Sequence, residues 1–319
     1  MFDRTKLNIL PLNNRKHDVD VTIIKGIDFN STESFENIKR VAKDICSAKA
    51  IGSSIIMFMG GHVIRAGVQR HLIDLMERGF ISCLAMNGAC IIHDYEFALV
   101  GATTENVAKY ISEGQFGLWL ETGQINDITN MAYAENEHCS LGASIGQHIY
   151  HSNMPHKDIS ILASAYRLNI PTTVHIGIGY DIIHEHPNFN AAAAGALSYN
   201  DFLILAKVIS NLEGGVVMNF GSAVMAPEVY LKALSMARNV AYQEGREICH
   251  FTNLVCDLVP LPEDISTEPT KTDHSYYFRP LKTMLIRTVA DGGNSYYVRG
   301  NHAETIPALC SYLNQAGEI

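Results

Sequence analysis

The feature that most constrains the fold is a repeated succession of a short apolar run, a glycine-bearing turn and a helical pattern. Residues 54–59 form an apolar run of strand length, residues 60–61 turn the chain, and residues 68–77 carry apolar side chains at helical spacing. A second unit has a strand and a turn over residues 81–89 and a helix that begins at Asp94. Such units in series predict an α/β fold, an open parallel sheet with helices on both faces.

The rest of the chain continues this alternation. Helices are predicted over residues 160–167 and 191–213 and from residue 226 onward, and strands over residues 171–176, 215–220, 250–258 and 283–289. Residues 105–144 are polar and interrupted by glycine, so they predict a connecting helix and an excursion. Residues 260–280 contain four prolines and predict a surface loop. Because the chain beyond that loop is too short for a core of its own, a single domain over residues 1–319 is expected.

Composition narrows the class of protein. Hydrophobic residues make up 47% of the chain and charged residues 18%, which supports a sizeable core and excludes a disordered chain. The net charge of -9 offers no basic face to nucleic acid and suits a small cationic substrate better. No run matches a signal peptide or the ~18 apolar residues of a membrane span, so a soluble cytoplasmic protein without a membrane partner is expected.

Three glycine-bearing turns are predicted at the carboxyl ends of strands, where open α/β sheets bind ligands. They are Gly60-Gly61-His62, Asn87-Gly88-Ala89 and Asn219-Phe220-Gly221-Ser222. None is a GxGxxG fingerprint, and in many proteins a glycine pair after a strand only turns the chain. Titratable residues, namely His62, Asp94 beside His93, and Asp181, follow in the sequence. Together these features predict a ligand crevice surrounded by acid–base groups.

No metal site and no serine nucleophile are predicted. The histidine pairs His184/His186 and His148/His151 have no recognisable third ligand, and the seven cysteines form no CxxC pair, which suits reduced thiols better than disulfides or zinc. A GxSxG elbow is also missing. Lys282 precedes the predicted strand over residues 283–289. A lysine at a strand edge is usually solvated, and only a desolvating crevice would make it a nucleophile.

Four segments, IIMFMGGHVIRAG, NIPTTVHIGIGYDIIH, VVMNFGSAVMAPEVYLKAL and IPALCSYL, resemble in this order deoxyhypusine synthase and its bacterial and archaeal relatives. The resemblance implies a Rossmann-like parallel sheet, NAD as cofactor, and a homotetramer made of dimers whose sites lie at subunit interfaces. It also implies a reaction. NAD takes hydride from the carbon beside an amine of a polyamine, and a lysine captures the resulting imine before the group is passed on.

The resemblance assigns roles to particular residues. The cofactor-binding residues that it implies lie in the three turns and in one later strand: Gly60, Gly61, Asn87, Gly88, Ala89, Asn219, Gly221, Ser222, Thr252, Asn253 and Asp257. His62, Asp94 and Asp181 are the candidates for amine binding and proton transfer, with Lys282 as imine acceptor. The family's Trp-Gly-Lys motif is replaced here by Pro280-Leu281-Lys282.

We therefore expect an NAD-dependent, transferase-like enzyme that oxidises a polyamine or a basic amino acid to an imine and then transfers or eliminates a group. One alternative is a deaminase similar to NAD-dependent archaeal ornithine cyclodeaminases, which needs no transfer lysine. Another is a non-catalytic or hydrolytic relative that keeps the fold, because one fold can host unrelated functions. A scaffold whose glycine turns serve only the backbone is the third.

Overall fold

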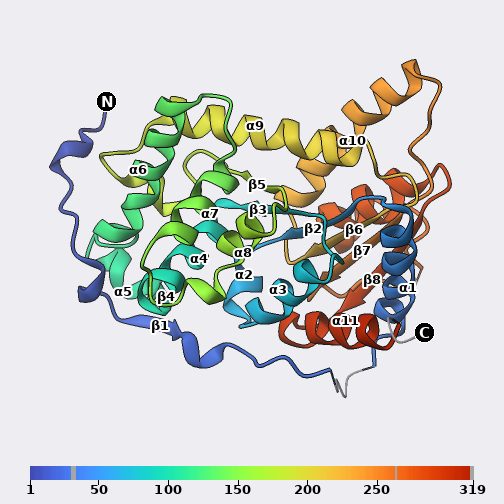
Figure 1. Ribbon diagram of the computed structural model, residues 1–319, viewed down its shortest axis with the longest axis horizontal. Helices are drawn as coiled ribbons and strands as arrows, with labels where there is room; N and C mark the ends of the chain where they lie inside the picture. The colour runs from blue at the N-terminus through green and yellow to red at the C-terminus, as the bar shows by residue number, and fades with distance from the viewer. Residues whose placement is uncertain (30–33, 263, 317–319) are drawn as a thin grey trace.

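The computed structural model describes residues 1–29, 34–262 and 264–316 (Figure 1). Its central sheet has six parallel strands: β2 (Ile55–Met59), β3 (Cys83–Asn87), β5 (Thr172–His175), β6 (Val216–Phe220), β7 (Thr252–Asp257) and β8 (Asn294–Arg299). They lie side by side in the order β5-β3-β2-β6-β7-β8. Along the sequence, β3 and β5 are added on one side of β2. The chain then crosses over, and β6, β7 and β8 are added on the other side of β2. This order, which reverses between β2 and β6, is that of dinucleotide-binding sheets and confirms the predicted Rossmann-like fold.

Burial on both faces explains why the central strands are continuous apolar runs. Every residue of β2 and β6 is buried. Successive side chains of a strand point to opposite faces, so Ile55 and Met57 join one hydrophobic core while Ile56 and Phe58 join the other.

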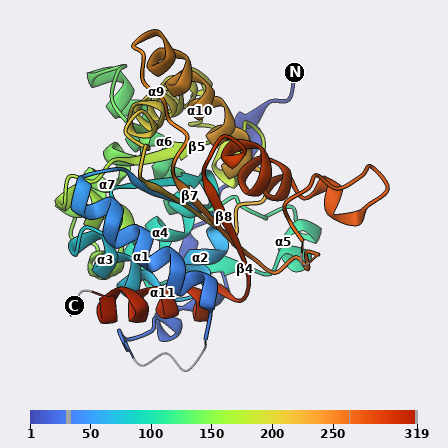
Figure 2. The same cartoon turned by 90° about the vertical axis from the view of Figure 1, so that its right-hand side faces the viewer.

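Helices cover both faces of the sheet, as predicted, with α9 and α10 on one side and α1 and α11 on the other (Figure 2). Helices that bury side chains in the first core include α1 (Glu36–Ile51), α3 (Gln69–Glu77), α4 (Gly88–Val100), α6 (Leu120–Glu135), α7 (Leu141–His151), α8 (Ile161–Arg167) and α11 (His302–Ala316). The second core is covered by α9 (Ala191–Ile209), α10 (Met225–Gln243) and the π-helix η7 (Leu281–Ile286).

The remaining elements are short. They are the helices α2 (Gly61–Arg65) and α5 (Val107–Ser112) and the 3-10 helices η1 (Arg4–Lys6), η2 (Leu12–Asn14), η3 (Val21–Ile23), η4 (Lys157–Ile159), η5 (Ile182–Glu185), η6 (His274–Tyr277) and η8 (Arg287–Val289). A separate antiparallel pair joins β1 (His17–Asp20) to β4 (Ala102–Glu105). This pair brings the amino-terminal segment against the end of α4.

Two predicted elements were wrong, and one strand was missed. The helix expected from Asp94 begins six residues earlier, at Gly88, because the Asn87 side chain caps it by accepting a hydrogen bond from the Cys90 amide. Residues 283–289 form no strand. They belong to η7 and η8, whose Leu281, Met284 and Leu285 are buried together in the second core. The sixth strand is instead β8, an edge strand of largely half-exposed residues that lacks an apolar run.

Within the described part of the chain, α9 has the length and the apolar composition that a membrane-crossing helix requires. The same properties occur in core helices of globular proteins. Asp201, on the buried face of α9, accepts hydrogen bonds from the backbone amides of Gly142 and Val174. This helix therefore ties α7 and β5 together.

Candidate functional site

A crevice lies where the strand order reverses, between β2 and β6. The turns that follow these two strands form it. A Cβ atom added to Gly60 would lie 2.4 Å from the Gly221 carbonyl oxygen, so the two turns are in direct contact. Gly221 has a φ of 65°, and a Cβ there would meet His302 Nε2 at 2.4 Å. Glycine is thus required at both positions, and the open edge of the sheet lies where parallel α/β sheets bind ligands.

Polar side chains surround this crevice. His302, the first residue of α11, is buried against Gly221, and its Nδ1 has no hydrogen-bond partner in the part of the chain that the structure describes. Burial lowers the pKa of His302, and the charges of Asp257 and His62 also act on it. The predicted cofactor-site residue Asp257 and the predicted proton-transfer residue His62 therefore lie near the same imidazole.

Asn219 and Ser222 hold the turn after β6. The Asn219 side chain donates to the Ser222 carbonyl oxygen and accepts from the Ser222 amide, at 3.0 and 3.2 Å. Ser222 Oγ accepts from the Ala226 amide at 3.1 Å in the first turn of α10. Both side chains thus shape the turn, and Asn219 Nδ2 also contacts Met284 Sδ of η7 at 3.4 Å.

A cavity of about 260 Å³ with both apolar and ionisable residues on its walls lies beside α4, next to this crevice. Its walls come from the segment around Asp18, from α2, α4 and β4, and from residues 180–182. The ionisable residues on its walls include Asp18, Arg65, His93 and Asp181. Acidic and basic groups therefore face the same small space, as recognition of an amino acid requires.

Asp181 lies directly against the first residue of α4. A Cβ on Gly88 would meet Asp181 Oδ2 at 2.0 Å, so glycine makes room for this carboxylate at the helix amino terminus. Burial raises the pKa of Asp181 to about 6. Its Oδ2 has no hydrogen-bond partner among the described residues, and His184 Nε2 lies 3.9 Å away. An ionised carboxylate with an unused oxygen at the wall of a cavity is suited to bind an ammonium group.

His93 stands between the cavity and the crevice. Its ring lies 3.1 Å from the Cβ position of Gly61, and its Nδ1 lies 2.8 Å from Thr103 Oγ1. The Thr103 hydroxyl has one proton, which it donates to Glu96 at 2.6 Å. His93 Nδ1 must therefore be the donor to Thr103, which leaves Nε2 without a proton. Burial lowers the pKa of His93 to about 4, so this imidazole is a neutral base at physiological pH.

Glu96 is fixed as a carboxylate by a buried ion pair. Arg15 binds both of its oxygens, at 2.9 and 2.7 Å, and Thr122 donates to it at 2.6 Å. Burial opposes ionisation, yet the Arg15 guanidinium and these hydrogen bonds hold the pKa of Glu96 below its usual value. The side chains of Arg15 and Glu96 are each 1% exposed. The series of hydrogen bonds Arg15–Glu96–Thr103–His93 thus sets the tautomer of His93.

Thr104, which also lines this cavity, has an unusual backbone conformation. Its φ is 61°, in the left-handed region that β-branched residues rarely adopt. Its hydroxyl is buried without a hydrogen-bond partner among the described residues. Strained residues of this kind concentrate at ligand sites.

The structure gives Asp94 a structural role in place of the predicted one. The carboxylate of Asp94 accepts hydrogen bonds from Ser160 Oγ and from the Ile161 and Leu162 amides, at 2.5, 2.8 and 3.1 Å. It therefore caps the amino terminus of α8 from within the core. Burial raises the pKa of Asp94 to about 6, against these hydrogen bonds. Asp94 was predicted from its place beyond the Asn87-Gly88-Ala89 turn, but neighbouring residues of a helix point in different directions, and its side chain faces α8.

Asp94→Ala is expected to lower the free energy of unfolding by about 2 kcal/mol, because it leaves a helix terminus and a hydroxyl without their acceptor. Urea denaturation measures this loss. The affinity for a substrate amine should stay unchanged in the folded variant. A variant of unaltered stability that no longer binds the amine would return Asp94 to the binding site.

Two of the predicted cofactor-binding residues lie at the wrong end of the sheet. Thr252 and Asn253 begin β7, and the crevice is at the carboxyl end of that strand. The Thr252 hydroxyl donates to Asp44 of α1, and Asn253 is buried among Tyr230, Met284 and Thr288. The strand itself was predicted correctly, but the residues at its amino end were assigned the wrong role.

Lys282 is also placed differently from the prediction. It lies in η7, is 5% exposed, and its Nζ stands 3.4 Å from the centre of the Tyr276 ring. This cation–π contact gives the ammonium a partner on the second-core side of the sheet. The cavity beside α4 lies on the other side, among elements of the first core.

Arg15, Glu96 and Thr104 were missed as candidates. The partners of Arg15 lie 81 residues away, and no periodic pattern connects the two segments. The histidines of the pair His184/His186 each have a partner in the backbone. His184 Nδ1 accepts from the Gly179 amide, and His186 Nε2 contacts the Gly117 carbonyl oxygen at 2.9 Å.

Comparison with known proteins agrees with the fold. The family described as arginine dihydrolase ArgZ-like, C-terminal, Rossmann fold matches residues 39–154. A deoxyhypusine synthase-like protein of Elusimicrobium minutum (strain Pei191) is 24% identical over 260 residues, covering 65% of this chain and 67% of that protein. The predicted resemblance to deoxyhypusine synthase-like proteins is thereby confirmed.

Solved structures share the fold at low sequence identity. A LOR/SDH protein from Methanococcus maripaludis S2 has a TM-score of 0.51 at 15% identity, over 92% of this chain and 74% of that one. AgrE, solved in a ternary complex with ornithine and NAD+, has a TM-score of 0.51 at 14% identity, over 90% of this chain. The chain spans 34% of AgrE and 33% of ArgZ, an arginine dihydrolase from cyanobacteria. The similar proteins thus include enzymes, and the shared feature is the Rossmann fold.

Proposed function

We propose that this protein is an NAD-dependent enzyme that oxidises the carbon–nitrogen bond of a small basic amino acid and releases ammonia from the resulting imine. The observation that carries the proposal is the cavity that joins Asp181, Arg65 and the neutral base His93 at the edge of the switch-point crevice. Similarity to AgrE, which was solved with ornithine and NAD+, supports the same class of substrate.

Several features of the crevice support the proposal of a dinucleotide site. The turns of Gly60 and Gly221 bring β2 and β6 together, and the unpartnered Nδ1 of His302 lies beside them. Gly61, the residues 87–89 at the start of α4, Ser222 and Asp257 would complete the binding surface. When bound, NAD+ supplies a hydride acceptor at this edge.

The side chains of the cavity explain how a zwitterionic amine would be held. Asp181 and Asp18 would bind the ammonium groups, and the exposed guanidinium of Arg65 would bind the carboxylate. A polyamine has no carboxylate to pair with Arg65, so the charge pattern favours an amino acid.

His93 supplies the proton chemistry. Its Nε2 accepts a proton from the substrate ammonium, and the freed lone pair forms the C=N bond as the hydride leaves the same carbon. The product is an iminium ion and a protonated imidazole, which the Glu96 carboxylate stabilises through Thr103. Attack of water on the iminium carbon, with loss of ammonia, regenerates a carbonyl compound. These steps need no lysine, which agrees with the placement of Lys282 against Tyr276.

The transferase reading is the second candidate, because the chain is similar to a deoxyhypusine synthase-like protein. In that reading a polyamine is the donor and Lys282 must turn away from Tyr276. Incubation with NAD+ and either ornithine or spermidine separates the two. The proposal expects NADH and free ammonia with ornithine. NADH formation with spermidine but not with ornithine would favour transfer, and no NADH with any amine would reject both.

Asp181→Asn tests the amine-binding role. Loss of the carboxylate is expected to raise the KM for the amine by about 100-fold or more, since a buried charge partner is removed. In the native protein, KM should fall as the pH rises through about 6, where Asp181 ionises. The exposed Asp158 provides the matched control, Asp158→Asn, with unchanged kinetics.

The Asp181→Asn substitution, which weakens amine binding, should increase the thermal stability of the protein. The folded-state pKa of Asp181 is raised, so burying its ionised form costs free energy above pH ~6, and that cost disappears below the unfolded pKa of ~4. Asp181→Asn is therefore expected to raise Tm at pH 8 and to leave it unchanged near pH 4. Equal shifts at both pH values would contradict a buried carboxylate.

A further inference from the structure

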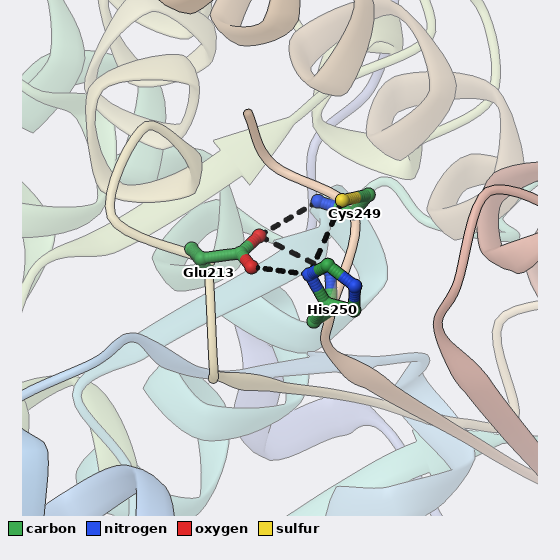
Figure 3. Close-up of side chains that lie close together, drawn as sticks. All are labelled: Glu213, Cys249 and His250. Carbon is green, nitrogen blue, oxygen red and sulfur yellow. Dashed lines mark hydrogen bonds and ion pairs between the residues drawn. The ribbon is translucent and has the colours of Figure 1, made fainter. Parts of the chain in front are cut away.

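A second cluster of ligand-type side chains lies at the amino edge of the sheet, opposite the crevice. Glu213 precedes β6, and Cys249 and His250 precede β7, so two neighbouring strands bring them together (Figure 3). Their ligand atoms all lie within 4.8 Å of one another. Figure 3 shows the carboxylate, the thiol and the imidazole converging on one region.

The contacts in this cluster centre on a single ring nitrogen. His250 Nδ1 lies 2.7 Å from Glu213 Oε1 and 3.3 Å from Cys249 Sγ. A catalytic Cys–His–acid relay would place the cysteine and the acid on different nitrogens of the histidine. Here both contact Nδ1, so the histidine cannot pass a proton from one to the other. The arrangement is instead that of donors around a common point.

The carboxylate of Glu213 is held in place for such a role. Its Oε2 accepts hydrogen bonds from the backbone amides of Cys249 and His250, at 2.7 and 3.1 Å. These bonds lock the carboxylate against the segment that carries the other two donors. Preorganisation of this kind, in which a ligand's second oxygen is fixed by the protein, accompanies metal sites.

The balance of charge calls for a cation. Glu247 adds a second carboxylate, with Oε2 3.8 Å from Cys249 Sγ. Cys249 is 9% exposed, so its thiol lies beside two carboxylates with little access to water. A divalent cation bound by the thiol in its deprotonated form would balance these acidic groups.

We propose that Glu213, Cys249 and His250 form a binding site for a divalent transition metal of the zinc class. Sulfur, imidazole nitrogen and carboxylate oxygen together are the donors that Zn²⁺ selects, in a tetrahedral arrangement. Glu247 or water supplies the fourth position. The ion joins the segments that lead into β6 and β7, so it stabilises the sheet at the edge away from the crevice. This site revises the expectation of no metal, which considered only residues close in sequence.

Cobalt(II) titration of the purified, metal-free protein tests the site directly. We expect one equivalent of Co²⁺ to produce thiolate-to-cobalt charge-transfer absorption and the visible bands of tetrahedral cobalt, both displaced by Zn²⁺. Cys249→Ser should abolish the charge-transfer band. His250→Gln should weaken Co²⁺ binding by more than the roughly 10–100-fold that the loss of an outer-shell partner costs.

Two controls keep the result specific. Cys46→Ser removes a half-buried thiol of α1, and His138→Gln removes an exposed histidine that pairs with Glu137 at 3.8 Å. Both should retain the full spectrum. Absence of any charge-transfer band in the native protein, or its persistence in Cys249→Ser, would overturn the proposal. Zn²⁺ should also raise the Tm of the native protein and of both controls but not that of Cys249→Ser, and this readout does not depend on enzymatic activity.

Discussion

His93→Gln is expected to lower kcat for amine oxidation by about 10²–10⁴-fold, the usual contribution of a positioned general base. Glutamine fills a similar volume and can still bond to Thr103, but it has no basic nitrogen at the position of Nε2. The binding of NAD+ and the KM of the amine should change little, because Asp181 and the glycine turns remain. Pre-steady-state measurement of NADH formation separates the two parameters.

The matched control is His71→Gln. His71 is a buried histidine of α3 whose pKa burial also lowers, but it does not line the cavity. The His71→Gln variant should keep the native kcat even if its free energy of unfolding falls. Thr103→Val supplies a graded test, because it leaves His93 in place and removes the acceptor that fixes its tautomer. A His93→Gln enzyme of normal kcat would show that the proton is taken elsewhere.

Arg15→Leu is expected to lower the free energy of unfolding by about 3–5 kcal/mol at neutral pH, since it leaves the buried Glu96 carboxylate uncompensated. Stability that depends on the depressed pKa of Glu96 is present above the unfolded pKa of ~4.3 and is lost as the pH falls through the folded value. The difference between native and variant proteins should therefore shrink in acid. Chemical denaturation between pH 2 and pH 8 checks both expectations.

The double variant Arg15→Leu/Glu96→Gln distinguishes a lost ion pair from a packing defect. Removing both charges should recover part of the stability, because the uncompensated carboxylate is gone. Arg40→Gln, in the exposed pair with Glu36 on α1, should cost no more than about 0.5 kcal/mol. Equal losses in the single and double variants would mean that the Arg15–Glu96 charge pair contributes little.

Much of the fold could be predicted because its signals are local. Buried parallel strands such as Ile55–Met59 and Val216–Phe220 are continuous apolar runs, and glycine marks the turns that follow them. The edge strand Asn294–Arg299 has no such run, and the apolar residues 283–289 resemble a strand although they wind into short helices. In both cases tertiary packing, which the local pattern does not contain, decides the structure.

The site was predictable only in part. The glycine turns and Asp181 were identified because each follows a strand. The roles of Asp94 and Arg15 depend on contacts with residues 66 and 81 positions away, which no motif signals. Thr252 and Asn253 were placed in the correct strand but at the wrong end, which matters because only the carboxyl ends of parallel strands meet at the crevice.

Calorimetric titration of the native protein with NAD+, alone and in the presence of ornithine, tests the central claim most directly. If the cofactor and the amine bind side by side, each should strengthen the binding of the other by about 5–150-fold, the usual range of coupling between sites. Saturable NAD+ binding that ornithine tightens is the predicted result. No NAD+ binding, or NAD+ binding that neither ornithine nor any other basic amine alters, would contradict the account.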